Sequence, residues 1–253
     1  MINPIFERLV LLTGKEGLEK LNNTHVLVFG AGGVGSWAAE ALVRSGVGKL
    51  GIIDNDVVCA SNVNRQVEAT PLTLGQPKAS ALKKRLLEIN PECDITAWDE
   101  IFCRETSGNF FIEKSDFVID AIDSLNHKLD LIEIVYNANV TLFSSMGMAL
   151  KTDPSQIKPA SIWKTGNCPL ARLVRQGLRK RNFSGDFTAV YSTETPMHNE
   201  TDEEQFVTTG GNSPYQGRKK VNGSIVTVTA SAGLLLASLV INSVLNEEQA
   251  GKA

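Results

Sequence analysis

Short apolar runs alternate with amphipathic stretches through the first 145 residues of the chain. Five of these runs have the character of buried strands: residues 25–30, 49–54, 94–98, 117–121 and 140–145. Helical spacing of apolar residues predicts four helices between them: residues 35–44, 77–90, 106–113 and 125–137. Apolar strands that alternate with helices are typical of parallel sheets covered on both sides. The order therefore predicts an α/β fold, a doubly wound, mostly parallel, Rossmann-like sheet with helices on both faces.

Both ends of the chain depart from this alternation. Residues 7–21 carry leucines at helical spacing, interrupted at Thr13 and Gly14, and indicate a helical arm. Beyond residue 150 the pattern becomes irregular. It predicts strands over 157–163 and 187–192, a basic amphipathic helix over 170–181 and a mobile polar loop over 198–220. We therefore expect an irregular C-terminal extension on a regular core.

Residues 221–245 contain no charged side chain, and the segment is long enough to cross a membrane. Polar side chains nevertheless recur along it: Asn222, Ser224, Thr227, Thr229, Ser231, Ser238 and Asn242. Because unpaired polar groups are costly in lipid, we expect a helix buried against the sheet or a partner subunit. Membrane contact is not expected.

Composition and charge limit the classes of function that the chain can have. The chain has 253 residues and a formal net charge of −3, so no overall positive field draws it to nucleic acid or membranes. Contact with nucleic acid has to come from a local basic patch. The four cysteines form no Cys-x-x-Cys pair, which argues against structural zinc and thiol exchange. Residues 1–6 carry no secretory signal, so we expect the cytoplasm.

The first candidate site is a glycine-rich turn after the first strand. Residues 30–35 place Gly30, Gly32, Gly33 and Gly35 between a strand and a helix. These glycines let backbone N–H groups approach a phosphate, and the helix N-terminus adds positive potential. Asp54 ends the second strand, where a carboxylate can bind ribose hydroxyls. These features fit NAD as well as ATP, and a tight turn without a ligand is the plainest alternative.

The segment after Asp54 favours a triphosphate. It carries side chains suited to phosphates: Asp56, Asn62, Arg65, Gln66 and, at the start of the next helix, Lys78. The glycine turn already meets the pyrophosphate of a dinucleotide, so two further cations have little use there. In ATP they can neutralise the charge that develops as pyrophosphate leaves. Solvated surface positions are the alternative interpretation for both.

Asp123 adds a candidate metal ligand. It follows the strand at 117–121, on the same carboxyl edge of the sheet as the glycine turn. Mg²⁺ prefers one or two carboxylates together with phosphate oxygens, so Asp123 could hold a metal that bridges the phosphates. Its alternative role is to cap the following helix.

Together these residues resemble the superfamily of ubiquitin-activating, molybdopterin-synthesis and thiamine-synthesis adenylyltransferases. The resemblance is strongest over residues 6–145. It implies that Asp54 binds ribose, with Asp56 and Gln66 beside it in the nucleotide pocket. It implies that Asn62, Arg65 and Lys78 contact the phosphates, and that Asp123 serves Mg²⁺. It also implies a homodimer, in which the catalytic Arg8 reaches the ATP of the neighbouring subunit.

Within this superfamily the chain looks most like the tRNA threonylcarbamoyladenosine dehydratases. The supporting stretches are residues 35–42, 120–124, 153–157, 191–194 and 232–238. The resemblance implies that ATP adenylates the threonyl carboxylate on the tRNA, and that the carbamoyl oxygen then expels AMP. It divides one domain, residues 1–253, into an arm (1–22), a nucleotide-binding core (23–150) and a region for substrate and dimer contacts (151–253).

A basic surface is the candidate contact for tRNA. Its residues cluster on the predicted helix and after the polar loop: Arg172, Arg175, Arg179, Lys180, Arg181, Arg218, Lys219 and Lys220. Local positive patches of this kind bind RNA phosphates, although solvated helix faces often carry the same charges.

Two other functions remain open from the sequence. One is an adenylyltransferase for the C-terminal glycine of a ubiquitin-like or sulfur-carrier protein, with a sulfur-relay partner, although such enzymes often carry Cys-x-x-Cys pairs. The other is a nucleotide-binding scaffold without turnover. Cys168 could form a thioester, but no histidine flanks it to lower its pKa. We interpret it as a loop residue.

Overall fold

The computed structural model describes residues 3–200 and 222–246. Its strands are β1 (His25–Phe29), β2 (Lys49–Ile53), β3 (Asp94–Trp98), β4 (Phe117–Asp120), β5 (Thr141–Ser145), β6 (Ile157–Ser161) and β7 (Thr188–Ser192). Its α-helices are α1 (Glu7–Asn22), α2 (Gly35–Arg44), α3 (Lys78–Ile89), α4 (Leu125–Asn137), α5 (Pro169–Lys180) and α6 (Val226–Asn246).

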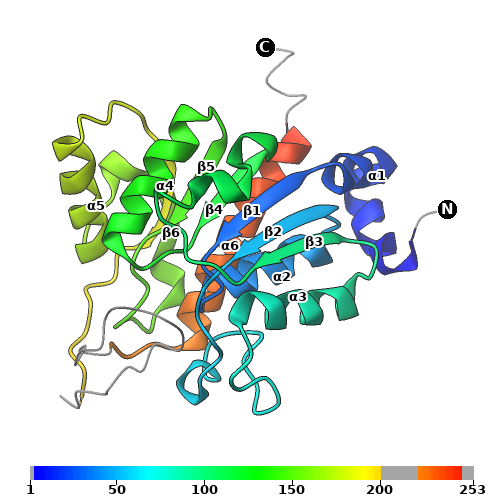
Figure 1. The fold of residues 1–253 in the computed structure, drawn as a ribbon, viewed down its shortest axis with the longest axis horizontal. Helices are drawn as coiled ribbons and strands as arrows, with labels where there is room; N and C mark the ends of the chain where they lie inside the picture. The colour runs from blue at the N-terminus through cyan, green and yellow to red at the C-terminus, as the bar shows by residue number, and fades with distance from the viewer. Residues whose placement is uncertain (1–2, 201–221, 247–253) are drawn as a thin grey trace.

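In the described residues the strands form one sheet, ordered β3-β2-β1-β4-β5-β7-β6 (Figure 1). Neighbours are parallel except β6 and β7, which are antiparallel. From β1 the chain winds outward to β2 and β3 and then returns to β4 on the other side. The expected doubly wound, mostly parallel sheet is therefore confirmed. This order places a switch point between β1 and β4, where ligands of such sheets bind at the carboxyl ends.

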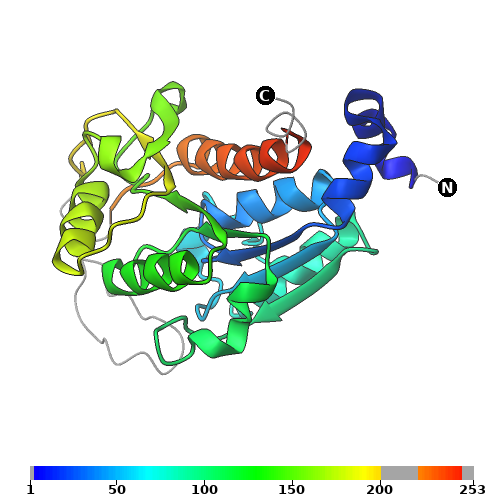
Figure 2. The ribbon, with the colours of Figure 1, turned by 90° about the horizontal axis from the view of Figure 1, so that it is seen from above.

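The two faces of the sheet carry separate apolar cores, because alternate residues of each strand point to opposite sides. Val26 and Val28 pack into the core that α2, α3 and α6 cover. Leu27 and Phe29 point the other way, into the core that α4 and α5 cover. Figure 2 shows α6 along α2 on one face and α4 on the other.

The uncharged helix α6 is long and apolar enough to cross a membrane by composition alone. In the structure it packs along α2 and the sheet, through buried residues that recur at helical spacing: Val228, Ala232, Leu236, Val240 and Val244. Gly233 lets the two helices touch, since a β-carbon there would lie 2.3 Å from the carbonyl oxygen of Val34. The expectation of a helix buried against the fold is confirmed.

One predicted helix is wrong. Residues 106–113 form two short 3-10 helices, η3 (Ser107–Phe110) and η4 (Ile112–Lys114), instead of a single α-helix. Phe111 stands between them with a left-handed φ of 48°. Phe110 and Ile112 are both buried, and residues two apart do not share a face of an α-helix. Burying both therefore requires the break.

The helical arm is confirmed, including its interruption, because Gly14 has φ 74° and kinks α1. The other helices and strands begin and end within a few residues of their predicted limits. Most of the predicted loop over 198–220 lies outside the described residues, together with Arg218, Lys219 and Lys220.

Candidate functional site

Three loops meet at the carboxyl edge of the sheet. The glycine turn follows β1, Asp54 follows β2, and Asp123 comes shortly after β4. Because β1 pairs in parallel with both β2 and β4, the ends of these strands are adjacent. The prediction that these residues gather at one sheet edge is confirmed.

The glycine turn depends on the absence of side chains. Gly30 has φ 94°, and a β-carbon there would lie 2.8 Å from the carbonyl oxygen of Ala121. A β-carbon on Gly35 would lie 1.8 Å from the carbonyl oxygen of Gly30. In the described part of the chain, no backbone acceptor meets the N–H groups of Gly32 and Gly33, just before α2. Free donors at a helix N-terminus are suited to an anion.

Asp54 ties this turn to the neighbouring strand. One carboxylate oxygen accepts the N–H of Ala31 at 2.7 Å, and the other accepts the N–H of Asp56 at 2.8 Å. Burial raises the pKa of Asp54, although the nearby ammonium of Lys78 opposes this effect. Each oxygen keeps a second lone pair, so Asp54 can position the turn and still accept hydrogen bonds from ribose hydroxyls.

Lys78 is a buried cation at the first position of α3. Its Nζ donates to Asp56 Oδ2 at 2.9 Å, and its backbone N–H donates to the carbonyl of Asp56 at 2.9 Å. Burial disfavours the ammonium form, but the carboxylates of Asp54 and Asp56 outweigh burial and raise the pKa of Lys78. The side chain is thus held charged close to the glycine turn.

Arg65 lies against the glycine turn from the other side. A β-carbon on Gly33 would lie 3.2 Å from Arg65 Cγ. The guanidinium donates to the carbonyl of Ser61 at 2.7 Å and to Asn64 Oδ1 at 3.0 Å. Trp37 Nε1 donates to the Arg65 carbonyl at 3.0 Å, which anchors the segment on α2. Burial lowers the pKa of Arg65 against the opposing charge of Glu68.

Asn62 has a structural part in this segment. Its side-chain oxygen accepts the N–H of Cys59 at 2.9 Å, which closes the 3-10 turn η2 (Ala60–Asn62). The backbone N–H of Arg65 in turn donates to the Asn62 carbonyl at 3.0 Å. Asn62 therefore shapes the loop that presents Arg65. Contact with a phosphate stays a prediction.

Two buried polar side chains at the site lack partners in the described residues. They are Gln66, through Oε1, and Glu68, through both carboxylate oxygens. Gln66 Nε2 would lie 3.9 Å from a β-carbon on Gly32, so the amide borders the phosphate cradle. Buried polar groups are normally paired. The amide nitrogen is the Gln66 atom at the cradle and can donate to a phosphate oxygen, whereas the unpartnered Oε1 needs a donor that a phosphate does not supply. The residues present fit a nucleotide phosphate through Gln66 Nε2 and the N–H groups of Gly32 and Gly33.

Sequence reasoning missed Glu68. It lies two residues after Gln66, in a stretch without strand or helix periodicity. Burial raises its pKa to about 7. A charged residue between Val67 and Ala69 was the only available signal, and it does not reveal burial.

Asp123 is exposed at the site edge. Among the described residues, no cluster of three or more His, Cys, Asp or Glu side chains could hold a metal ion. Any Mg²⁺ there would need ligands from the nucleotide, which agrees with the preference of Mg²⁺ for phosphate oxygens and water.

A fully buried ion pair lies beneath this loop and was also missed. Lys128 Nζ, on α4, donates to Asp120 Oδ2 at 2.6 Å and to the Ser145 carbonyl at 3.1 Å. Ser144 Oγ donates to the same carboxylate oxygen at 2.6 Å. The other oxygen accepts the N–H of Ile122 at 3.0 Å. The pair therefore fixes the chain between β4 and Asp123. A lysine on the apolar face of the predicted helix was the available signal.

Arg8 is not brought to this site within its own chain. It lies on α1. Leu9 and Leu18 of this helix, together with the preceding Phe6, pack around Gly46 in the turn that leads into β2. That turn is at the amino edge of the sheet, opposite the glycine turn. The contact of Arg8 with the nucleotide of a second subunit stays a prediction.

The basic residues of α5 differ in how free their side chains are to contact RNA phosphates. Arg172 and Lys180 are exposed. Arg175 donates to Thr165 Oγ1, and Arg179 stacks 5.5 Å from the ring centre of Trp163.

Arg181 pairs with Asp130 at 2.7 Å and with Glu133 at 2.8 Å. These carboxylates neutralise its charge. Contact of Arg181 with RNA stays a prediction, although its guanidinium is already paired with these carboxylates.

Cys168 is buried before α5, with Sγ 3.9 Å from the Gly147 carbonyl. That carbonyl also accepts from Lys151 Nζ at 3.1 Å, and burial lowers the pKa of Lys151. Burial of the thiol favours the structural interpretation of Cys168 over a thioester role.

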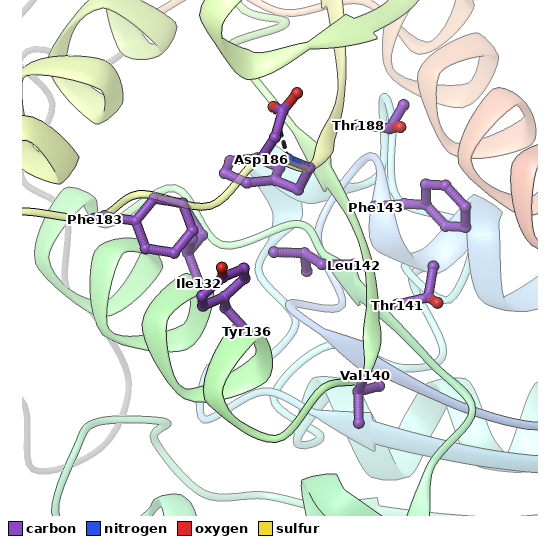
Figure 3. Close-up of a pocket in the computed structure, with 10 residues that line it drawn as sticks. Ile132, Tyr136, Val140, Thr141, Leu142, Phe143, Phe183, Asp186 and Thr188 are labelled. Carbon is purple, nitrogen blue, oxygen red and sulfur yellow. Dashed lines mark hydrogen bonds between the residues drawn. The ribbon is translucent and has the colours of Figure 1, made fainter.

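A separate cavity of about 270 Å³ lies between α4, β5 and the chain before β7 (Figure 3). Its walls are mainly apolar, and Tyr136 and Phe183 form an edge-to-face pair with ring centres 4.9 Å apart. Thr141 and Thr188, which line it, begin their strands. The cavity is thus at the amino edge of the sheet, away from the glycine turn.

Comparison with known proteins places these features in a family. The chain is 41% identical over 244 residues to a tRNA threonylcarbamoyladenosine dehydratase of Bacillus subtilis, covering 96% of this chain and 95% of that protein. It is 32% identical over 246 residues to the dehydratase of Escherichia coli, covering 92% and 91%.

The fold agrees with a solved structure. The crystal structure of the Escherichia coli dehydratase in complex with ATP matches with a TM-score of 0.85 and 30% identity, covering 99% of this chain and 97% of that one. The model of the ThiF family matches residues 6–252. The chain belongs to the ThiF family.

Proposed function

We propose that this chain is an ATP-dependent tRNA threonylcarbamoyladenosine dehydratase. ATP would adenylate the threonyl carboxylate, and the carbamoyl oxygen would then attack the acyl-adenylate and release AMP. The observation that carries the proposal is the convergence of Lys78, Arg65 and unpaired turn N–H groups beside the amide nitrogen of Gln66. Similarity to dehydratases over more than nine-tenths of the chain supports the same substrate.

Each site residue has a task that its geometry allows. The N–H groups of Gly32 and Gly33 would bind phosphate oxygens at the N-terminus of α2. Asp54 would accept ribose hydroxyls while it holds the turn. Lys78 and Arg65 would stabilise the negative charge that develops as pyrophosphate departs, because fixed charges need no reorganisation during the reaction.

Asp123 is the residue proposed to hold Mg²⁺. The metal, when bound, would neutralise phosphate charge. Asp123 is exposed and follows a backbone that Asp120 fixes from below, so its carboxylate has room for a hydrated ion.

The tRNA and a second subunit complete the proposal. Exposed Arg172 and Lys180 on α5 would contact tRNA phosphates. A homodimer would bring Arg8 from the partner, and half-exposed Leu234 together with exposed Leu11 and Leu12 offers apolar surface for that contact. The cytoplasm is the proposed compartment, because tRNA and ATP meet there.

Release of AMP tests the function. Purified protein is incubated with ATP, Mg²⁺ and tRNA that carries threonylcarbamoyladenosine, and AMP and cyclised nucleoside are measured. The same tRNA without the threonylcarbamoyl group is the control and should give no AMP. Release only with a Gly-Gly-ended carrier protein would instead indicate the carrier-activating alternative. ATP binding without any turnover would indicate a scaffold.

A further inference from the structure

Glu68 is a buried carboxyl group for which the mechanism above has no use. Its side chain is 2% exposed, and neither oxygen has a hydrogen-bond partner in the described residues. A charged carboxylate in such a place is costly because burial removes it from water. Burial accordingly raises the pKa of Glu68 to about 7.

Charged groups of the nucleotide site affect the protonation of Glu68. Lys78 at the start of α3 favours its charged form, and Asp54 at the end of β2 opposes it. Arg65, three residues away on the same segment, feels the charge of Glu68. From α2 the uncharged hydroxyl of Ser36 also favours the charged form of Glu68. Asp56 acts on this cluster through its ion pair with Lys78.

The charge balance of this cluster changes when a polyphosphate arrives. Without Glu68, two cations (Arg65 and Lys78) face two carboxylates (Asp54 and Asp56). A charged Glu68 adds a third negative group that competes with the phosphates for both cations. Neutral Glu68 removes this competition, so the phosphates and a proton on Glu68 favour each other's binding.

We propose that Glu68 is a positioning residue that takes up one proton from solvent when ATP binds, and so removes a negative charge that competes with the phosphates for the field of Arg65 and Lys78. The proton binds a carboxylate oxygen of Glu68, and no other bond forms or breaks. The inference rests on the proposed function, since it assumes a polyphosphate in the cradle. It adds a coupled protonation that the adenylation chemistry does not itself require.

Calorimetry measures this proton directly. Mg-ATP is titrated into the full-length protein at pH 8, without tRNA, in two buffers with different ionisation enthalpies. The dependence of the heat on buffer gives the protons taken up. We expect close to one more proton for the wild type than for Glu68→Gln. Protons that belong to ATP itself cancel in this comparison.

A matched control changes the same charge elsewhere. Glu88→Gln lies on the exposed side of α3 and should take up protons like the wild type. Between pH 7 and pH 8 the wild-type affinity for ATP should fall by up to about fivefold, while that of Glu68→Gln stays flat.

The outcomes separate the two hypotheses. Equal proton uptake by the wild type and a folded Glu68→Gln variant overturns the role of Glu68 while leaving the nucleotide site intact. If Glu68→Gln does not fold, the pH dependence of wild-type ATP affinity decides, and a flat profile overturns the inference. A wild type that does not bind ATP at any pH overturns the proposed function itself.

Discussion

The buried carboxyl group of Glu68 makes the stability of this protein depend on pH. Glu68 binds a proton more tightly in the folded chain than in the unfolded one, since its pKa is about 7 against an ordinary value of 4.5. Between these values the folded state holds the extra proton. Its contribution to the free energy of unfolding therefore falls as pH rises from 4.5 to 7 and stays low above that.

Glu68→Gln should for this reason stabilise the protein at high pH. The amide cannot ionise, so the variant escapes the cost of a buried charge. We expect its free energy of unfolding at pH 8 to exceed that of the wild type by about 3 kcal/mol. The difference should vanish near pH 4. Urea unfolding across this pH range measures it, and a constant difference would contradict the assignment of the buried charge.

Breaking the ion pair between Lys128 and Asp120 should lower the stability of the protein. Lys128→Met leaves a fully buried carboxylate without its cation, which costs about 3–5 kcal/mol. Adding Asp120→Asn should recover much of this loss, because the uncompensated charge is then gone. Denaturant unfolding of both variants measures the recovery. Lys180→Met, on the exposed side of α5, is the control and should stay near the wild type. Equal stability of the single and double variants would exclude the pair as the cause.

Sequence reasoning identified the residues that belong to a motif and missed those whose role depends only on their buried position. The glycine turn, Arg65 and Lys78 stand at spacings that a phosphate site requires, so they could be named before the fold was known. In the sequence, Glu68 and Lys128 look like ordinary charged residues. Their roles come from neighbours that the sheet brings together.

At the scale of elements, the contact between α2 and α6 links the C-terminal helix to the glycine turn. Gly233 faces the carbonyl of Val34, which lies in that turn. Gly233→Ala would force a methyl group against backbone and should cost about 1–3 kcal/mol, with weaker ATP binding as a second effect. Thermal unfolding and ATP titration measure both. Gly108→Ala meets open space and should change neither. Unchanged stability of Gly233→Ala would mean that the helices are not in close contact.

Helix α5 makes a prediction about RNA. Arg172→Glu with Lys180→Glu should weaken tRNA binding and reduce the slope of log affinity against log salt by about two. ATP binding should be unaffected. Filter binding across a salt series measures the slope. Lys83→Glu with Lys84→Glu makes the same charge change on α3 and serves as the control. An equal slope for both double variants would remove α5 from the RNA surface.

Most elements followed from periodicity, and the one exception has its cause in tertiary packing. The apolar residues between 106 and 113 suited a helix, but Phe110 and Ile112 both enter the core around Phe29. A left-handed Phe111 makes this possible. Tertiary burial overrode the local pattern, and phenylalanine at position 111 gives no sign in the sequence of a positive φ.

For the whole molecule, the sheet order could be anticipated because alternating strands and helices permit few topologies. The placement of Arg8 could not follow from one chain, since α1 packs at the amino edge and the nucleotide turn lies at the carboxyl edge. If the proposed homodimer forms, each active site combines Lys78 of one subunit with an arginine from the other. A heterodimer that carries changes in both residues therefore distinguishes this arrangement from a site contained in one chain.

Two differently tagged subunits test it. A heterodimer with Arg8→Ala on one subunit and Lys78→Ala on the other keeps one intact site under the shared arrangement, so we expect about half of the wild-type AMP release. A heterodimer with both changes on the same subunit, beside a wild-type subunit, should be nearly inactive, because each site then lacks one residue. A site that uses its own Arg8 reverses the two outcomes. Activity of the second heterodimer but not of the first would therefore place Arg8 with the nucleotide of its own chain.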